Sequence, residues 1–141
     1  MVIKYFLITI FLVIAAYIDF KKHIIPNWLN LSFFVLRFAL IPLYTLDMFH
    51  IYGAIFGFAM FFIPALLLKQ DIGGDIKMAT VLGIWLGIED VILVLTLSAL
   101  LALVYMLIKK SKGIPFAPST LIAFLLWLGF NLISYSNYTI Y

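Results

Sequence analysis

The chain alternates long apolar stretches with short polar connections. The stretches are solid runs rich in Leu, Ile and Phe without a strict apolar–polar alternation, which favours helices over membrane strands. They predict six helices, at about 2–18, 27–46, 49–68, 75–88, 91–108 and 116–136. A helix needs about 20 mostly apolar residues to cross a bilayer. We therefore expect an all-α, polytopic integral membrane protein with about six transmembrane helices, forming a single membrane-embedded domain over residues 1–141.

Composition narrows the class further. Only nine Lys or Arg and six Asp or Glu occur among 141 residues, so 11% of the chain is charged. Soluble domains average about 25% charged residues. This scarcity argues against an ordinary soluble enzyme, a disordered chain and a nucleic-acid-binding protein. Cysteine is absent, which excludes disulfides, a thiol nucleophile and a cysteine-based zinc site.

Some positions qualify the helix pattern. The first apolar run has no small-residue cleavage pattern, and further hydrophobic segments follow it, so we interpret it as a retained helix rather than a secretory signal. Pro42 and Pro64 lie inside predicted segments and indicate kinks or early helix ends. Arg37 interrupts the second segment, and an arginine near the bilayer centre costs about 2.5–3.5 kcal/mol. It could snorkel, mark a break in the helix, or pair with an acid inside the bundle.

The loop charges predict the orientation. Seven basic residues fall after the first, third and fifth predicted helices or at the start of the helix that follows: Lys21, Lys22, Lys69, Lys77, Lys109, Lys110 and Lys112. The other connections contain Asp47, Glu89 and Asp90 and no Lys or Arg. Cytoplasmic loops carry the excess of Lys and Arg. We therefore expect the basic connections in the cytoplasm and both termini outside the cell membrane, with Lys4 as one exception.

Three acids lie on the basic side of this topology: Asp19, Asp71 and Asp75. Asp19 ends the first predicted helix and Asp75 begins the fourth, at membrane boundaries where desolvating a charge is unfavourable. One interpretation is that they are interfacial residues paired with lysines, as Asp19 could be with Lys22. The other is that they are functional. Asp71 lies in a glycine-bearing loop, where a plain loop role is the simpler interpretation.

The side chains available restrict the possible chemistry. No G-x-S-x-G or H-E-x-x-H motif occurs, and His23 and His50 fall on opposite sides of the predicted membrane. No metal or cofactor is expected. Two neighbouring aspartates could share a proton, so that one acts as base toward a water and the other as acid toward a carbonyl oxygen. Such a pair titrates as a unit, which leaves the individual assignment open.

The fourth predicted helix carries a stripe of small residues. Asp75, Ala79, Gly83 and Gly87 recur every four residues, and residues 53–57 contain a second G-x-x-x-G. Such spacing allows another helix to pack very close. The stripe could serve helix packing alone, or it could let a substrate segment approach the carboxylate.

Three motifs resemble those of the type IV prepilin peptidases. Asp19 followed by residues 25–29, Ile-Pro-Asn-Trp-Leu, resembles their first aspartate motif. Residues 73–77, Gly-Gly-Asp-Ile-Lys, resemble the second, the G-x-G-D motif of intramembrane aspartyl proteases. Residues 113–118, Gly-Ile-Pro-Phe-Ala-Pro, are similar to the I-P-F-G-P segment before the last helix. The positions that support the motifs are Pro26, Asn27, Gly73, Gly74, Lys77, Pro115 and Pro118.

The resemblance implies an intramembrane aspartyl endopeptidase with Asp19 and Asp75 as its catalytic pair. Such an enzyme removes the short leader of prepilin, pseudopilin or preflagellin-like precursors at the cytoplasmic membrane face. Its expected partners are these precursors and the lipid bilayer, with no nucleic acid. Which precursor is cleaved and the oligomeric state stay open.

Two departures from the family pattern stand out. Ile72 occupies the position of the first glycine in G-x-G-D. Bifunctional members carry an N-terminal, cysteine-bearing region and an N-methyltransferase activity, whereas the first aspartate here is residue 19. The resemblance is therefore to the short, peptidase-only form, and no N-methyltransferase domain is expected.

Two other functions compete with the peptidase. A small proton-coupled transporter also uses intramembrane carboxylates, usually near the membrane midplane. A non-catalytic scaffold would tolerate replacement of both aspartates.

Overall fold

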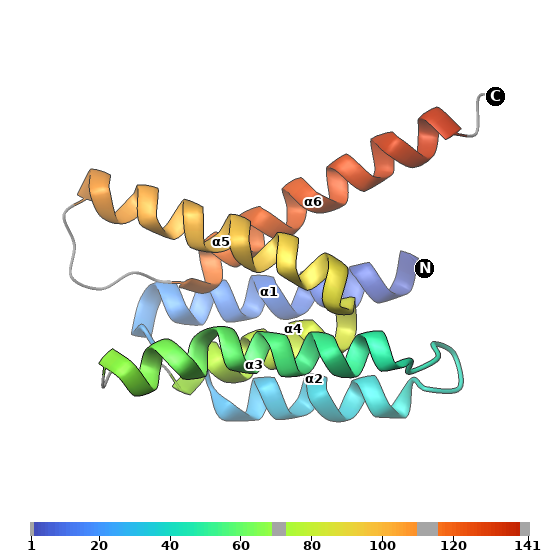
Figure 1. Ribbon diagram of the computed structural model, residues 1–141, viewed down its shortest axis with the longest axis horizontal. Helices are drawn as coiled ribbons and strands as arrows, with labels where there is room; N and C mark the ends of the chain where they lie inside the picture. Colours follow the sequence, from blue (N-terminus) through green and yellow to red (C-terminus); the bar gives the residue numbers. More distant parts are fainter. Residues whose placement is uncertain (1, 69–72, 110–115, 139–141) are drawn as a thin grey trace.

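The computed structural model describes residues 2–68, 73–109 and 116–138, which form six helices (Figure 1). The helices are α1 (Val2–Lys22), α2 (Asn27–Ala39), α3 (Met48–Leu68), α4 (Gly73–Leu86), α5 (Ile88–Lys109) and α6 (Phe116–Tyr138). Four of them, α1, α3, α5 and α6, are long and apolar enough to cross a membrane. The predicted all-helical, polytopic membrane architecture is confirmed.

Two helices are too short to span a bilayer alone. The 13 residues of α2 and the 14 residues of α4 give lengths of about 20 Å at 1.5 Å per residue. The hydrocarbon core is about 30 Å thick. α4 packs against both α2 and α3, and α3 with α4 forms the most extensive helix pair (Figure 1).

Consecutive helices run in opposite directions, so α1 begins and α6 ends at the same end of the bundle (Figure 1). Lys21, Lys22 and Lys109 lie at the other end, where α1 and α5 finish. Lys4 lies at the end that holds the acidic connections and interacts electrostatically with Asp90. The lysines at the ends of α1 and α5 therefore lie at one end of the bundle and the acidic connections at the other, which agrees with the predicted alternation of charge.

The second predicted helix, 27–46, is wrong at its C-terminal end, because α2 ends at Ala39. Arg37 is 1% exposed and donates from Nε to Ile84 O at 3.1 Å, from Nη1 to Tyr44 O at 3.1 Å and from Nη2 to Thr45 O at 3.0 Å. The guanidinium thus satisfies one carbonyl at the end of α4 and two in the turn after α2. Among the possibilities for Arg37, a helix that breaks close to it is the one observed.

Gly87 alone joins α4 to α5. Its φ of +92° lies in the left-handed region that favours glycine, and its N–H donates to Gly83 O at 2.9 Å. The predicted connection at residues 89–90 is wrong, because both residues belong to the first turn of α5. Pro64 does not end α3, which continues to Leu68.

The small-residue stripe of α4 packs against α3. A Cβ on Gly53 would lie 2.5 Å from Gly83 O, and a Cβ on Gly57 would contact Ala79 O even more closely. Only glycine lets the two backbones approach this far. The stripe therefore serves helix packing: α3, rather than a substrate segment, lies against Ala79 and Gly83.

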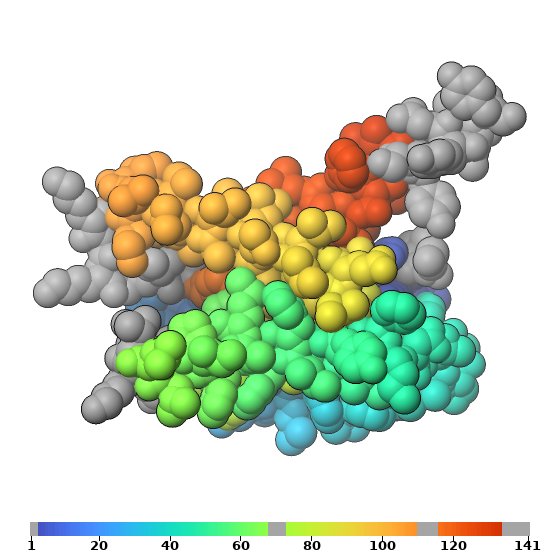
Figure 2. Space-filling model, viewed as in Figure 1, coloured from blue at the N-terminus to red at the C-terminus, as the bar shows by residue number. Residues whose placement is uncertain are grey.

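The outer surface is strongly apolar. Figure 2 shows α3 and α5 covering the front face, while the C-terminal half of α6 projects beyond the bundle. Large side chains such as Leu67 (75%), Ile108 (77%) and Phe130 (73%) are exposed. An exterior of this kind suits lipid rather than water.

Candidate active site

Asp19 lies in the last turn of α1 and is 5% exposed. Its Oδ2 accepts a hydrogen bond from the backbone N–H of Ala117 at 3.0 Å. Ala117 is the second residue of α6, so the carboxylate occupies the N-terminus of that helix, where N–H groups lack helical partners. Lys22, the partner considered from sequence, is exposed. The interaction observed for the Asp19 carboxylate is therefore with a helix end.

Asp75 is the third residue of α4 and is partly buried. The negative charge of Asp19 acts on the Asp75 carboxyl, so the aspartates of the first and second motifs are electrostatically coupled. Asp75 lies outside the four helices long enough to cross a membrane. Burial and, secondarily, the charge of Asp19 raise the pKa of the Asp75 carboxyl to about 7.

The connection between α1 and α2 brings the first two motifs into contact. His23 adopts a left-handed conformation at φ +52°, ending α1, and Pro26 is the N-cap of α2. A Cβ on Gly74 would lie 3.2 Å from Ile25 Cβ, tighter than an ordinary contact. Glycine at position 74 therefore lets the start of α4, and with it Asp75, pack against this connection.

A polar contact joins the same two motifs. Lys77 Nζ donates to Asn27 Oδ1 at 2.7 Å, linking the first residue of α2 to the fifth residue of α4. The resemblance pointed to both residues as motif positions, and the fold gives them a shared role. Gly73 begins α4 two residues before Asp75.

The third motif supplies the start of α6. The Phe116 side chain is buried and its ring packs edge-on against Phe61 of α3 at 4.8 Å between centroids. Pro118 is the third residue of α6, within the first turn where proline is tolerated. Sequence reasoning missed the donor itself, the Ala117 N–H, because a backbone group carries no residue signature.

Several predicted positions lie outside the described residues. These are Lys69, Asp71, Ile72, Lys110, Lys112 and Pro115. Among the described residues, no group of three or more His, Cys, Asp or Glu side chains could hold a metal ion.

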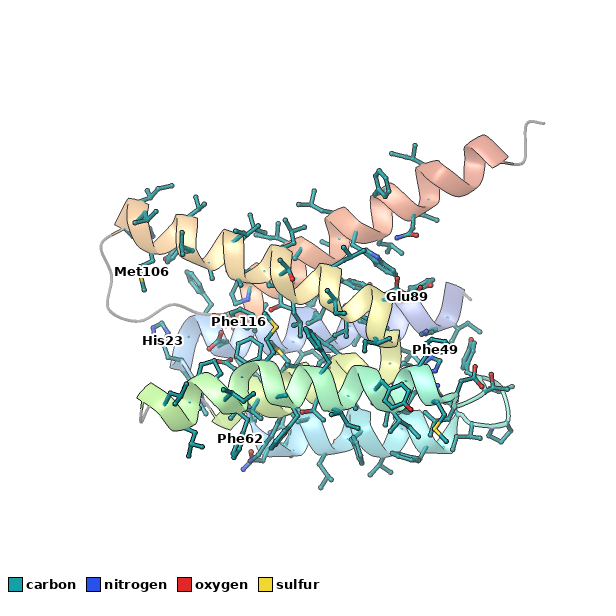
Figure 3. All side chains as sticks on the ribbon, viewed as in Figure 1. His23, Phe49, Phe62, Glu89, Met106 and Phe116 are labelled. Carbon is teal, nitrogen blue, oxygen red and sulfur yellow. The ribbon has the colours of Figure 1, made fainter. Side chains whose placement is uncertain are left out.

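The histidines lie apart, as expected from sequence. Figure 3 shows His23 and Phe116 toward one end of the bundle and Phe49 and Glu89 toward the other. His50 follows Phe49 in the first turn of α3. The two histidines therefore cannot act together, and the carboxylate pair is the chemical feature shared by the three motifs.

The comparisons with known proteins agree with the motifs. The profile of the type IV leader peptidase family matches residues 6–107. A curated relative, the prepilin leader peptidase/N-methyltransferase of Vibrio cholerae serotype O1 (strain ATCC 39315 / El Tor Inaba N16961), is 32% identical over 126 residues, covering 77% of this chain. The chain spans about half (48%) of that relative's length. No solved structure matches this chain. The chain belongs to the type IV leader peptidase family.

Proposed function

We propose that this protein is an aspartic endopeptidase that removes the leader peptide of prepilin-like precursors. The observation that carries the proposal is the convergence of its three motifs on one carboxylate pair. Asp19 comes from the first motif, Asp75 from the second, and the Ala117 N–H from the third donates to Asp19. A packing role alone would not require two coupled carboxyl groups in this position.

The pair provides an acid and a base for hydrolysis by water. The Ala117 N–H hydrogen bond stabilises the Asp19 carboxylate, whereas burial and then the charge of Asp19 raise the pKa of Asp75 to about 7, so that Asp75 keeps its proton below neutral pH. We assign Asp19 as the group that accepts a proton from the attacking water. The water oxygen bonds to the carbonyl carbon while Asp75 donates its proton to the carbonyl oxygen. When the tetrahedral intermediate collapses, the C–N bond breaks, Asp19 gives the proton taken from the water to the leaving amine, and Asp75 takes back a proton from a hydroxyl of the intermediate. The two carboxyls exchange protons as a unit over the cycle.

The active site faces the cytoplasm in this proposal. Lys21, Lys22 and Lys109 lie at the same end of the bundle as Asp19. Basic residues concentrate on the cytoplasmic side of membrane proteins. A proton-coupled carrier is less well supported, because its acids usually lie near the midplane. Asp19 and Asp75 instead lie in terminal turns of their helices.

Cleavage of a co-expressed prepilin tests the proposal. Asp19→Asn and Asp75→Asn should each abolish leader removal, since either change deprives the pair of one carboxyl group. Asp90→Asn, at the opposite end of the bundle, is the matched control and should cleave normally. Asp71→Asn should also keep substantial activity. Normal cleavage by either Asp19→Asn or Asp75→Asn would refute the catalytic assignment.

A further inference from the structure

His23 ends α1 in an unusual backbone conformation. Its φ of +52° lies in the left-handed region, and in the described part of the chain it is the one residue other than glycine found there. Its N–H closes the last turn of α1 by donating to Asp19 O at 2.8 Å. A Cβ makes this conformation unfavourable, and glycine or asparagine is the usual residue at such a helix end. The chain therefore keeps an imidazole where the backbone geometry favours a smaller residue.

The His23 side chain is open to solvent and close to the proposed catalytic pair. His23 is exposed, whereas Asp19, one turn earlier on α1, is buried. The two side chains interact electrostatically, and a protonated imidazole stabilises a neighbouring carboxylate. Figure 3 shows His23 toward the same end of the bundle as Phe116, which begins the helix that holds Asp19. A charge on the exposed imidazole therefore acts on the buried carboxylate.

The helices packed against the end of α1 bring other groups to Asp19. From α4, Asp75 interacts with it as a second carboxyl group. From α6, backbone N–H groups act on it, and the first four residues of that helix, 116–119, include no titratable side chain. The first turn of α2, residues 27–30, includes none either. Among the described residues, His23 is thus the cationic side chain that acts on Asp19.

The lysines at this end of the bundle have different surroundings. Three of them have partners of their own, namely Lys21 with the Tyr17 hydroxyl at 2.6 Å, Lys77 with Asn27 Oδ1 at 2.7 Å, and Lys109 with the Tyr105 ring at 5.3 Å from its centroid. Lys22 is exposed. None of these lysines interacts electrostatically with the Asp19 carboxyl as His23 does.

We propose that His23 is a positioning residue whose protonated imidazole stabilises the Asp19 carboxylate and keeps it available as the base at mildly acidic pH. The inference rests on the proposed function. As the pH falls, protonation of Asp19 would remove the base. An imidazole gains its positive charge between about pH 8 and pH 5, and this charge opposes protonation of the carboxylate beside it. Cleavage therefore continues to a lower pH than it would without His23.

Three substitutions at position 23 separate the charge from the backbone conformation. His23→Asn and His23→Gly remove the charge with residues that tolerate a positive φ, whereas His23→Lys keeps a positive charge. The measurement is kcat for cleavage of purified prepilin in detergent from about pH 5 to pH 8. In His23→Asn and His23→Gly, kcat at about pH 5 should fall about threefold, as the low-pH limb moves up by about half a pH unit. Near pH 7.5 it should be unchanged, and His23→Lys should follow the wild-type limb.

Thermal unfolding and a matched charge control distinguish this role from a structural one. His23→Gly removes the Cβ from a left-handed residue, so its thermal midpoint should be unchanged or higher although kcat at about pH 5 falls. Lys22→Gln removes a positive charge from the neighbouring exposed residue and should leave the pH–rate profile unchanged. Added salt should reduce the difference between His23→Asn and the wild type, because exposed charges are screened.

Three results would overturn the role of His23. These are a wild-type pH–rate profile in His23→Asn, a loss at about pH 5 in His23→Lys as large as in His23→Asn, and a uniform loss at every pH with a lower midpoint. Failure of the proposed function looks different. Normal cleavage by Asp19→Asn refutes the catalytic pair, whereas an inactive Asp19→Asn protein together with a wild-type profile in His23→Asn refutes the role of His23 alone.

Discussion

The backbone N–H of Ala117 donates a hydrogen bond to Oδ2 of Asp19 at 3.0 Å, across 98 residues of sequence. The N-terminus of α6 therefore holds a carboxylate from the end of α1, and the partial positive charge of a helix start favours that carboxylate's ionised form. This contact gives the third motif a function near the proposed catalytic pair. It also links the geometry of α6 to the reactivity of Asp19.

Removing this donor should slow cleavage. Ala117→Pro lacks the N–H but sits in the first turn of α6, where proline is tolerated. A hydrogen bond to a charged group contributes about 1.5–3 kcal/mol, so we expect a loss of roughly tenfold to hundredfold in kcat. The measurement is cleavage of purified prepilin in detergent. Glu89→Pro, at the equivalent second position of α5, is the control and should retain activity; equal rates in both variants would contradict this role.

The pH dependence of cleavage should reflect the pair. Because the pKa of Asp75 is raised to about 7, the pair carries one proton between the low-pH range, where both carboxyls are protonated, and about pH 7. Raising the pH above about 7 removes that proton and with it the acid, so kcat should fall about tenfold per pH unit. At low pH both carboxyls become protonated and the base is lost. A pH–rate profile from about 5 to 9, with helicity followed by circular dichroism, tests this, and a flat profile above neutral pH would be inconsistent with it.

The contact between α3 and α4 should be sensitive to a single methyl group. Gly83→Ala places a Cβ against the Gly53 backbone, which cannot yield as a flexible side chain can. We expect destabilisation of about 1–3 kcal/mol, as for other overpacked sites. Gly129→Ala is the matched control, since no atom lies within 4 Å of its added Cβ. It should be neutral or stabilising by up to about 1 kcal/mol. Thermal unfolding in detergent distinguishes them, and equal shifts would argue against the close packing.

Arg37 should be essential for stability rather than for chemistry. Arg37→Met leaves three carbonyl oxygens without their donor, and we expect a loss of at least about 2 kcal/mol in unfolding free energy. Arg37→Lys should recover only part of it, because an ammonium group cannot reproduce the guanidinium fork. Lys109→Met, at an exposed helix end, controls for the loss of a charge. An Arg37→Met protein with an unchanged midpoint would contradict this role.

The helix ends mark the limit of what the apolar pattern could predict. The run from 27 to 46 looks continuous apart from Arg37 and Pro42, yet α2 stops at Ala39. Arg37 is satisfied there by carbonyls of Tyr44, Thr45 and Ile84. One of these carbonyls belongs to α4, so the stopping point depends on a neighbour that local hydropathy does not encode. Glu89 also looks like a loop residue in the apolar pattern but lies in the first turn of α5.

For the site, sequence motifs identified side chains but not their partners. Asp19 and Asp75 were selected by residue type and position, and the fold couples them electrostatically. The Ala117 donor carries no such signature. Its importance comes from where a backbone N–H at the start of one helix lies relative to a carboxylate at the end of another.

By itself, the sequence determined the membrane class, the six helices, the alternation of charge between connections and the family motifs, because these depend on composition and short-range order. The tertiary structure alone decided that the start of α6 meets Asp19, that glycines bring α3 against α4, and that Lys77 of α4 donates to Asn27 of α2. Each of these contacts joins segments far apart in the chain. Only the packing of the helices brings such segments within the range of a hydrogen bond or a van der Waals contact.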